Sequence, residues 1–160
     1  MGIYLNFNSV QGDVTEKEHT GWIEVLDAQW STSRSIRSAV GASTNRESSS
    51  AYVSEFTITK YVDKSSHELT TSAMTGAAVT NVEVDFTRTN QEGELTFRKI
   101  VMTDVIISSL VNSGHNQDRP TETLSFNFTQ IAVTDTTEDD AGTPVNNKTV
   151  TFDLGLSKVT

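Results

Sequence analysis

Residues 56–76, FTITKYVDKSSHELTTSAMTG, contain a strand pattern followed directly by a helix pattern. The first residues alternate apolar and polar side chains, which is typical of a strand with one buried face. The next part predicts a short helix, because Ser65 and Glu68 have the spacing of a capping box and Gly76 supplies a left-handed stop. A helix of about three turns is marginal in isolation, so we expect it to pack against a sheet.

The same alternation recurs from one end of the chain to the other, as it does in antiparallel sheets with one wet and one dry face. It is found in residues 3–7, 82–87, 123–129 and 149–156. Serine and threonine fill many of the polar positions, and threonine favours strands because it is β-branched. The composition therefore indicates a mostly β protein.

Two further stretches are strand-like but irregular. Residues 22–30 break the alternation near residues 26–27, for which a β-bulge is the expected cause. Residues 95–111 change phase, and the apolar triplet at 105–107 is typical of a segment buried on both faces. The patterns together predict seven or eight strands and one helix. That many strands in a small domain close into a barrel or split into two packed sheets.

Three segments between these strands lack periodicity and are predicted as loops: residues 31–51, 112–121 and 134–147. The first is some twenty residues long, and loops of that length inside a compact domain are usually functional or disordered. The last is acidic, and we expect it to be flexible.

Length and composition limit the possible functions. The 160 residues, with no dividing linker, predict one domain spanning 1–160. With no cysteine, the chain has no disulfide, no cysteine-type zinc site and no cysteine nucleophile. Its net charge of −9 argues against binding nucleic acid or an anionic membrane surface. No apolar run could cross a membrane and no signal-peptide pattern occurs, so we expect no membrane insertion.

The candidate catalytic and metal-binding residues are few. His19, His67 and His115 are not spaced as metal ligands, so we interpret them as solvated surface histidines and expect no metal. Glu83 and Asp85 could form a glycosidase pair, but alternating acids on a strand usually mark its solvent face. We predict no catalytic residue and no cofactor, and a binding or assembly module is the favoured class over an enzyme.

Several segments resemble the Hcp family, the haemolysin-coregulated proteins that form the tube of the type VI secretion system. The strongest similarity is at residues 56–66, which look like the family's F-T-K-x-x-D-x-S/T-S/T signature before its single helix. Weaker blocks, in family order, are residues 22–26, 104–109, 118–122 and 124–128. The long loop and the segment after residue 135 depart from the family pattern.

The resemblance implies a small β-barrel of two antiparallel sheets with one short flanking α-helix. It also implies that the chain is not an enzyme: six copies form a homohexameric ring, and the rings stack into a tube that is expelled from the cell. The partners implied are the chain itself, the sheath and spike proteins of the machine, and effector proteins carried in the lumen. The protein would be cytoplasmic before firing and then secreted without a signal peptide.

The resemblance also suggests which residues take part in assembly. In relatives the extended loop reaches towards the neighbouring ring, and here it carries Arg34, Arg37, Arg46 and Glu47. We expect the arginines to meet carboxylates of the next ring, the alternative being a solvated loop. The sheet that contains residues 22–30 lines the lumen in the family, which makes Asp27 and Gln29 candidate lumen residues. The alternative function is a monomeric β-sandwich that binds carbohydrate or a host surface. A third possibility is a structural relative from a phage-like particle.

Overall fold

The computed structural model describes residues 1–38 and 46–160, which form a mostly β structure of antiparallel strands with one helix, α1 (Ser66–Thr75). The strands before the helix are β1 (Gly2–Phe7), β2 (Ile23–Glu24), β3 (Asp27–Gln29), β4 (Thr32–Ser33), β5 (Ile36–Ser38), β6 (Arg46–Ser48), β7 (Tyr52–Val53) and β8 (Phe56–Tyr61). Those after it are β9 (Val79–Asn90), β10 (Gly93–His115), β11 (Asp118–Asn127), β12 (Gln130–Glu138), β13 (Pro144–Asp153) and β14 (Lys158–Val159). In the described part of the chain, α1 is too short and too polar to span a membrane.

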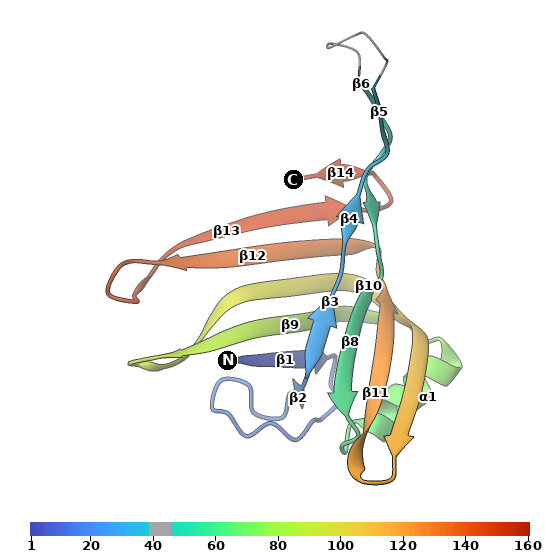
Figure 1. The fold of residues 1–160 in the computed structure, drawn as a ribbon, viewed down its shortest axis with the longest axis vertical. Coiled ribbons are helices and arrows are strands. Elements are labelled where there is room, and N and C mark those ends of the chain that lie inside the picture. The colour runs from blue at the N-terminus through green and yellow to red at the C-terminus, as the bar shows by residue number, and fades with distance from the viewer. Residues whose placement is uncertain (39–45) are drawn as a thin grey trace.

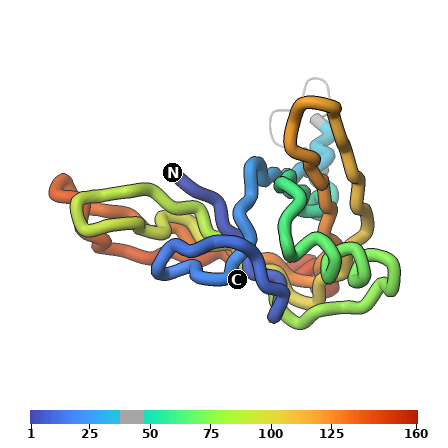
Figure 2. The backbone as a smooth tube through the Cα atoms, turned by 90° about the horizontal axis from the view of Figure 1, so that it is seen from below, coloured from blue at the N-terminus to red at the C-terminus, as the bar shows by residue number. Residues whose placement is uncertain are grey.

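Two sheets share the long strand β10. Sheet A has the order β2-β1-β9-β10-β12-β13-β14, and sheet B has the order β10-β11-β8-β3. Figure 1 shows the strands of the two sheets running in crossed directions. In Figure 2 the β9–β10 and β12–β13 hairpins project to one side, while β8, β11 and α1 gather on the other. Two sheets joined through one strand describe this arrangement more closely than a closed barrel.

Strand β10 passes from sheet A to sheet B at Asp104, which has a positive φ of 51°. Thr129 braces this bend, because its backbone N–H donates to the Thr103 carbonyl at 3.0 Å and its hydroxyl lies 3.3 Å from the Asp104 carboxylate. The bend explains the change of phase predicted for residues 95–111. It also makes one prediction wrong: Val105 is buried, but Ile106 points outward and is 39% exposed.

The break near residues 26–27 has a similar cause, and the predicted β-bulge is wrong. Strand β2 pairs with β1 in sheet A, and β3, three residues further on, pairs with β8 in sheet B. The chain therefore changes sheets between Glu24 and Asp27. The side chains on either side of this crossing belong to different faces, which disrupts the alternation.

The hydrophobic core lies between the two sheets and the helix. Its fully buried members come from alternate positions of the strands, as the sequence pattern predicted, and include Leu5, Val84, Ile100 and Met102 from sheet A, Phe56, Ile58, Leu124 and Phe126 from sheet B, and Leu69 from α1. Phe7 and Phe126 meet across the interface with ring centroids 5.7 Å apart. Burying a side chain of this size contributes about 1.5–3 kcal/mol, so this layer accounts for much of the folding free energy.

Helix α1 ends as predicted but begins differently. Gly76 has the left-handed conformation, and its N–H donates to the Ser72 carbonyl at 3.1 Å. The capping box is wrong, because the N-cap residue Ser65 makes no side-chain capping hydrogen bond. Instead, both the hydroxyl and the backbone N–H of Ser65 donate to the Asp63 carboxylate. The Ser65 hydroxyl, which a capping box would use to cap the helix, is therefore bound to a buried carboxylate that precedes the helix.

The three predicted loops contain more strand than the sequence indicated. Residues 112–121 form the end of the β10–β11 hairpin, with two residues between His115 and Asp118. Residues 134–147 are largely the paired ends of β12 and β13. In the long segment 31–51, β4 pairs with β7 and β5 with β6, although residues 39–45 lie outside the described chain. We call residues 31–38 and 46–54 the arm; Figure 1 shows it projecting beyond both sheets.

One exposed ion pair should make a small, pH-dependent contribution to stability. Arg98 donates two hydrogen bonds to the Asp135 carboxylate, at 2.6 and 3.0 Å, and these bonds lower the pKa of Asp135. A lowered pKa in the folded state stabilises the protein at neutral pH, and the effect is lost as the pH falls through that pKa. We expect Asp135→Asn to cost at most about 1 kcal/mol at neutral pH, since both side chains are nearly half exposed. Urea unfolding of both proteins should show the difference shrinking as the pH falls below the ordinary carboxyl pKa and vanishing only below the lowered pKa of Asp135. A difference that stays constant as the pH falls would contradict this assignment.

Candidate functional site

The arm is held together by backbone pairing and by serine side chains. At its base, Ser31 and Ser54 exchange backbone and side-chain hydrogen bonds of 2.8 Å. Further out, the Ser35 N–H donates to the Ser49 hydroxyl at 3.1 Å, and the Ser49 N–H donates to the Ser35 carbonyl at 3.0 Å. Short serine side chains can thus join the two strands of the arm without a hydrophobic core.

The described arginines on the arm face solvent. Arg34 and Arg37 are exposed, and the Arg34 guanidinium donates to the Ser48 hydroxyl at 3.1 Å. The backbones of Arg46 and Glu47 belong to β6, where Glu47 pairs with Arg37. The side chains of Arg46 and Glu47 lie outside the described residues. The arm therefore presents at least two guanidinium groups on an otherwise acidic protein.

An apolar hollow lies where the arm meets sheet A. It is lined by Trp30, which directly precedes the arm, by Val53 at the base of the arm, and by Val150, Phe152 and Val159 from the last strands. Val150 is 56% exposed and Val159 is 61% exposed, although both border an apolar surface. Such a hollow, rimmed by exposed valines, is suited to contact with another apolar surface.

The outer face of sheet B is polar and brings the two candidate lumen residues together. Asp27 pairs with Thr59 and Gln29 with Thr57, and both Asp27 and Gln29 are exposed. Hydroxyl pairs continue the face across β8 and β11: Thr57 with Ser125 and Thr59 with Thr123, each at 3.3 Å. This surface offers many small hydrogen-bonding groups, with the exposed side chains of Ile106 and Val111 at its β10 edge.

A buried lysine cluster, which sequence analysis missed, fixes the helix to sheet B. Lys60 is fully buried, and its Nζ donates to Glu122 Oε2 and Asp63 Oδ1, both at 3.0 Å. The same amine donates to the Tyr61 carbonyl at 2.8 Å, and Ser66 donates to Glu122 Oε2 at 2.9 Å. The alternation of β8 already places Lys60 on the inner face after Phe56 and Ile58, so a buried partner could have been expected from the sequence.

A second polar cluster lies where residues 8–22 fold over sheet A, and it overturns two predictions. His19 and Asp85 are each only 4% exposed, so neither faces solvent. The His19 Nδ1 is 2.7 Å from Glu16 Oε2, and the Nε2 is 3.0 Å from Asp85 Oδ2. The folded segment covers the face of β9 that an open sheet would expose to water. His67 and His115 are exposed, as predicted.

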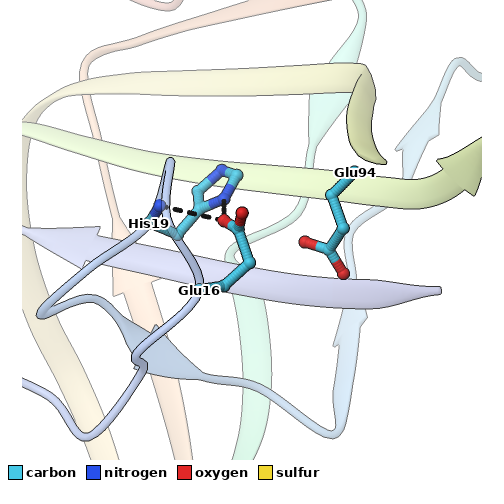
Figure 3. A group of neighbouring side chains, drawn as sticks. All are labelled: Glu16, His19 and Glu94. Carbon is cyan, nitrogen blue, oxygen red and sulfur yellow. Dashed lines mark hydrogen bonds and ion pairs between the residues drawn. The ribbon is translucent and has the colours of Figure 1, made fainter. Parts of the chain in front are cut away.

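Charge and burial perturb two groups around this second cluster. Although burial opposes it, hydrogen bonds from the His19 side chain and from the backbone lower the pKa of Glu16. Burial, followed by the negative charge of Glu94, raises the pKa of Tyr4, whose hydroxyl donates to Glu94 Oε1 at 3.2 Å. Figure 3 shows Glu94 approaching Glu16 and His19 from a different segment of the chain.

The fold and these surfaces define a two-sheet β protein with a projecting polar arm. The chain belongs to the Hcp family: the family model described as "Type VI secretion system effector, Hcp" matches residues 4–134. Members of this family are structural proteins of the type VI secretion system, and the resemblance found in the sequence is confirmed.

Individual relatives agree with the family assignment. The chain is 26% identical over 132 residues to protein hcp1 of Pseudomonas aeruginosa, covering 82% of this chain and 80% of the relative. A solved "type six secretion system protein" has a TM-score of 0.92 at 24% identity and covers 99% of both chains. Hcp1 from Salmonella typhimurium has a TM-score of 0.80 at 18% identity, covering 99% of this chain and 98% of the other. At these identities the structural matches establish the fold alone.

Proposed function

We propose that six copies of this chain form a ring and that the rings stack into the expelled tube of a type VI secretion system. The observation that carries the proposal is the family match over residues 4–134. One surface supports it physically. A ring needs two different patches that meet head to tail, and the apolar hollow at the base of the arm can supply one of them.

The mass of the purified protein tests ring formation. Six copies of 17.5 kDa give 105 kDa, whereas the alternative, a monomeric β-sandwich binding module, gives 17.5 kDa. Light scattering coupled to size-exclusion chromatography distinguishes these values directly. A strictly monomeric protein at high concentration would refute the ring and favour the monomeric module.

Reversing charge on the arm should prevent stacking without affecting the ring. In the proposed tube, Arg34 and Arg37 meet carboxylates of the next ring, with Arg46 and Glu47 further along the same arm. We expect the double variant Arg34→Glu/Arg37→Glu to abolish tubes in negative-stain images and to keep the mass of the ring. The matched control Arg34→Lys/Arg37→Lys keeps the charge and should keep the tubes. Unchanged tubes in the charge-reversed protein would show that the arm is merely solvated.

The polar face of sheet B is the proposed wall of the lumen, with Asp27 and Gln29 directed inward. A wall of hydroxyl, amide and carboxylate groups would hold effector proteins by many weak hydrogen bonds and would release them readily. The remaining proposed partners are the sheath and spike proteins of the machine. In this scheme the protein is cytoplasmic before firing and leaves the cell through the machine, without a signal peptide.

A further inference from the structure

The cluster around His19 has no part in the proposed assembly, yet its residues have the chemistry of metal ligands. Glu16 and His19 belong to the segment of residues 8–22, and Glu94 lies near the start of β10. The fold brings two carboxylate oxygens and one imidazole nitrogen of these residues within 4.8 Å of one another. Figure 3 shows the side chain of Glu94 lying beside that of Glu16.

His19 is oriented as a ligand by the groups behind it. Its Nε2 is 3.0 Å from Asp85 Oδ2, and both residues are more than nine-tenths buried. The Tyr4 ring stacks on the imidazole at 4.6 Å, and Trp22 meets it edge-on at 4.8 Å. Metal-binding histidines typically donate their second ring N–H to a carboxylate, which fixes the tautomer and the ring orientation. Here that arrangement directs Nδ1 towards Glu16 and Glu94.

The carboxylate of Glu94 is incompletely partnered: its Oε2 atom is inaccessible to solvent and has no hydrogen-bond partner among the described residues. Lys99 Nζ lies 3.9 Å from Asp85 Oδ1, and within the described residues no ion pair joins a cation to Glu94. A buried carboxylate oxygen without a partner is costly, and a cation is one way to satisfy it.

We propose that Glu16, His19 Nδ1 and Glu94 bind a zinc-type divalent cation. Zinc accepts nitrogen and oxygen ligands at about 2.0–2.2 Å, which places neighbouring ligand atoms on the order of 3 Å apart. The 2.7 Å between His19 Nδ1 and Glu16 Oε2 is a hydrogen-bond distance, so the ion would replace the proton between these two atoms and move them slightly apart. Two carboxylates balance the charge of the ion, and the imidazole favours zinc over magnesium or calcium. The ion would tie residues 8–22 to the β9–β10 hairpin.

The test uses the untagged full-length protein after removal of metals with a chelator. Zinc at one hundred times its Kd multiplies the folding equilibrium constant about 100-fold, which should raise the thermal unfolding midpoint by roughly 5–10 °C. Magnesium alone should not. Glu94→Gln should keep the metal-free midpoint and lose the zinc-dependent rise. The matched control Glu92→Gln changes an exposed acid two residues away and should respond like the original protein.

Calorimetric titration with zinc supplies a second measurement that does not depend on unfolding. We expect one zinc per chain in the original protein, and none in Glu94→Gln or in Glu16→Gln. The double variant His67→Gln/His115→Gln, which removes the two exposed histidines, should still bind one. Absence of binding in the original protein, unchanged binding in Glu94→Gln, or loss of binding in the double variant would each overturn the proposal.

Discussion

Lys60→Met should lower the free energy of unfolding by about 3–5 kcal/mol, because it leaves two buried carboxylates without their cation. Lys60 is fully buried, and the side chains of Asp63 and Glu122 are only 6% and 3% exposed. Methionine keeps most of the side-chain volume, so the loss reflects the charge and hydrogen bonds rather than a cavity. Urea unfolding at a fixed protein concentration measures it, since oligomerisation would otherwise shift the apparent stability.

The control for this prediction is a lysine in solvent. Lys64 is 58% exposed at its side chain and makes only a 3.7 Å contact with Asp13. Lys64→Met should therefore change stability by no more than about 0.5 kcal/mol. A double-mutant cycle with Lys60→Met and Glu122→Gln should show strong coupling, because the second change removes one of the charges that the first leaves unpaired. Additive costs, or a loss below about 1 kcal/mol for Lys60→Met, would contradict the role of this network.

The Lys60 cluster also shows how far the sequence can predict this fold. The alternation correctly predicted which side chains of most strands face the core, because successive residues of a strand point to opposite faces of the sheet. It could not predict where the chain changes sheets, at residues 24–27 and at Asp104, because these turns depend on contacts with distant segments. The capping box predicted at Ser65 also depends on a distant contact, because the Ser65 hydroxyl donates to the Asp63 carboxylate, which Lys60 holds in place.

Other predictions failed where a segment is exposed or covered on both sides. The arm was predicted as a loop because strands with solvent on both faces need no apolar alternation, and backbone pairing alone leaves little trace in a sequence. His19 and Asp85 were predicted to face water because their burial depends on residues 8–22 folding over β9. No local pattern encodes that contact. The arm residues chosen as assembly candidates remain a proposal.

Gly12→Ala should destabilise the protein by about 3 kcal/mol or more, because the added methyl group would collide with backbone. A Cβ atom at Gly12 would lie 2.1 Å from the Trp22 carbonyl oxygen and 2.6 Å from the Ile23 Cα. Overpacking a core typically costs about 1–3 kcal/mol when side chains can shift. Here the obstacle is main chain next to strand β2, which cannot rotate away.

The collision would separate residues 12–14 from residues 21–22, the two ends of the segment that carries Glu16 and His19. Three backbone hydrogen bonds join these ends: Gly12 N–H to the Gly21 carbonyl at 2.8 Å, Val14 N–H to the Trp22 carbonyl at 3.1 Å, and Gly21 N–H to the Val14 carbonyl at 2.8 Å. We therefore expect hydrogen exchange in residues 8–22 to accelerate in Gly12→Ala, as it does when a region opens locally.

A second glycine provides the matched control for the Gly12 variant. A Cβ atom at Gly114, near the end of β10, would meet nothing within 4 Å. Gly114→Ala should therefore change the free energy of unfolding by no more than about 0.5 kcal/mol, with unchanged exchange in residues 8–22. Equal costs for the two variants would mean that the loss reflects glycine flexibility in general. A loss of stability in Gly12→Ala alone would show that the close approach of Gly12 to the Trp22 backbone causes it.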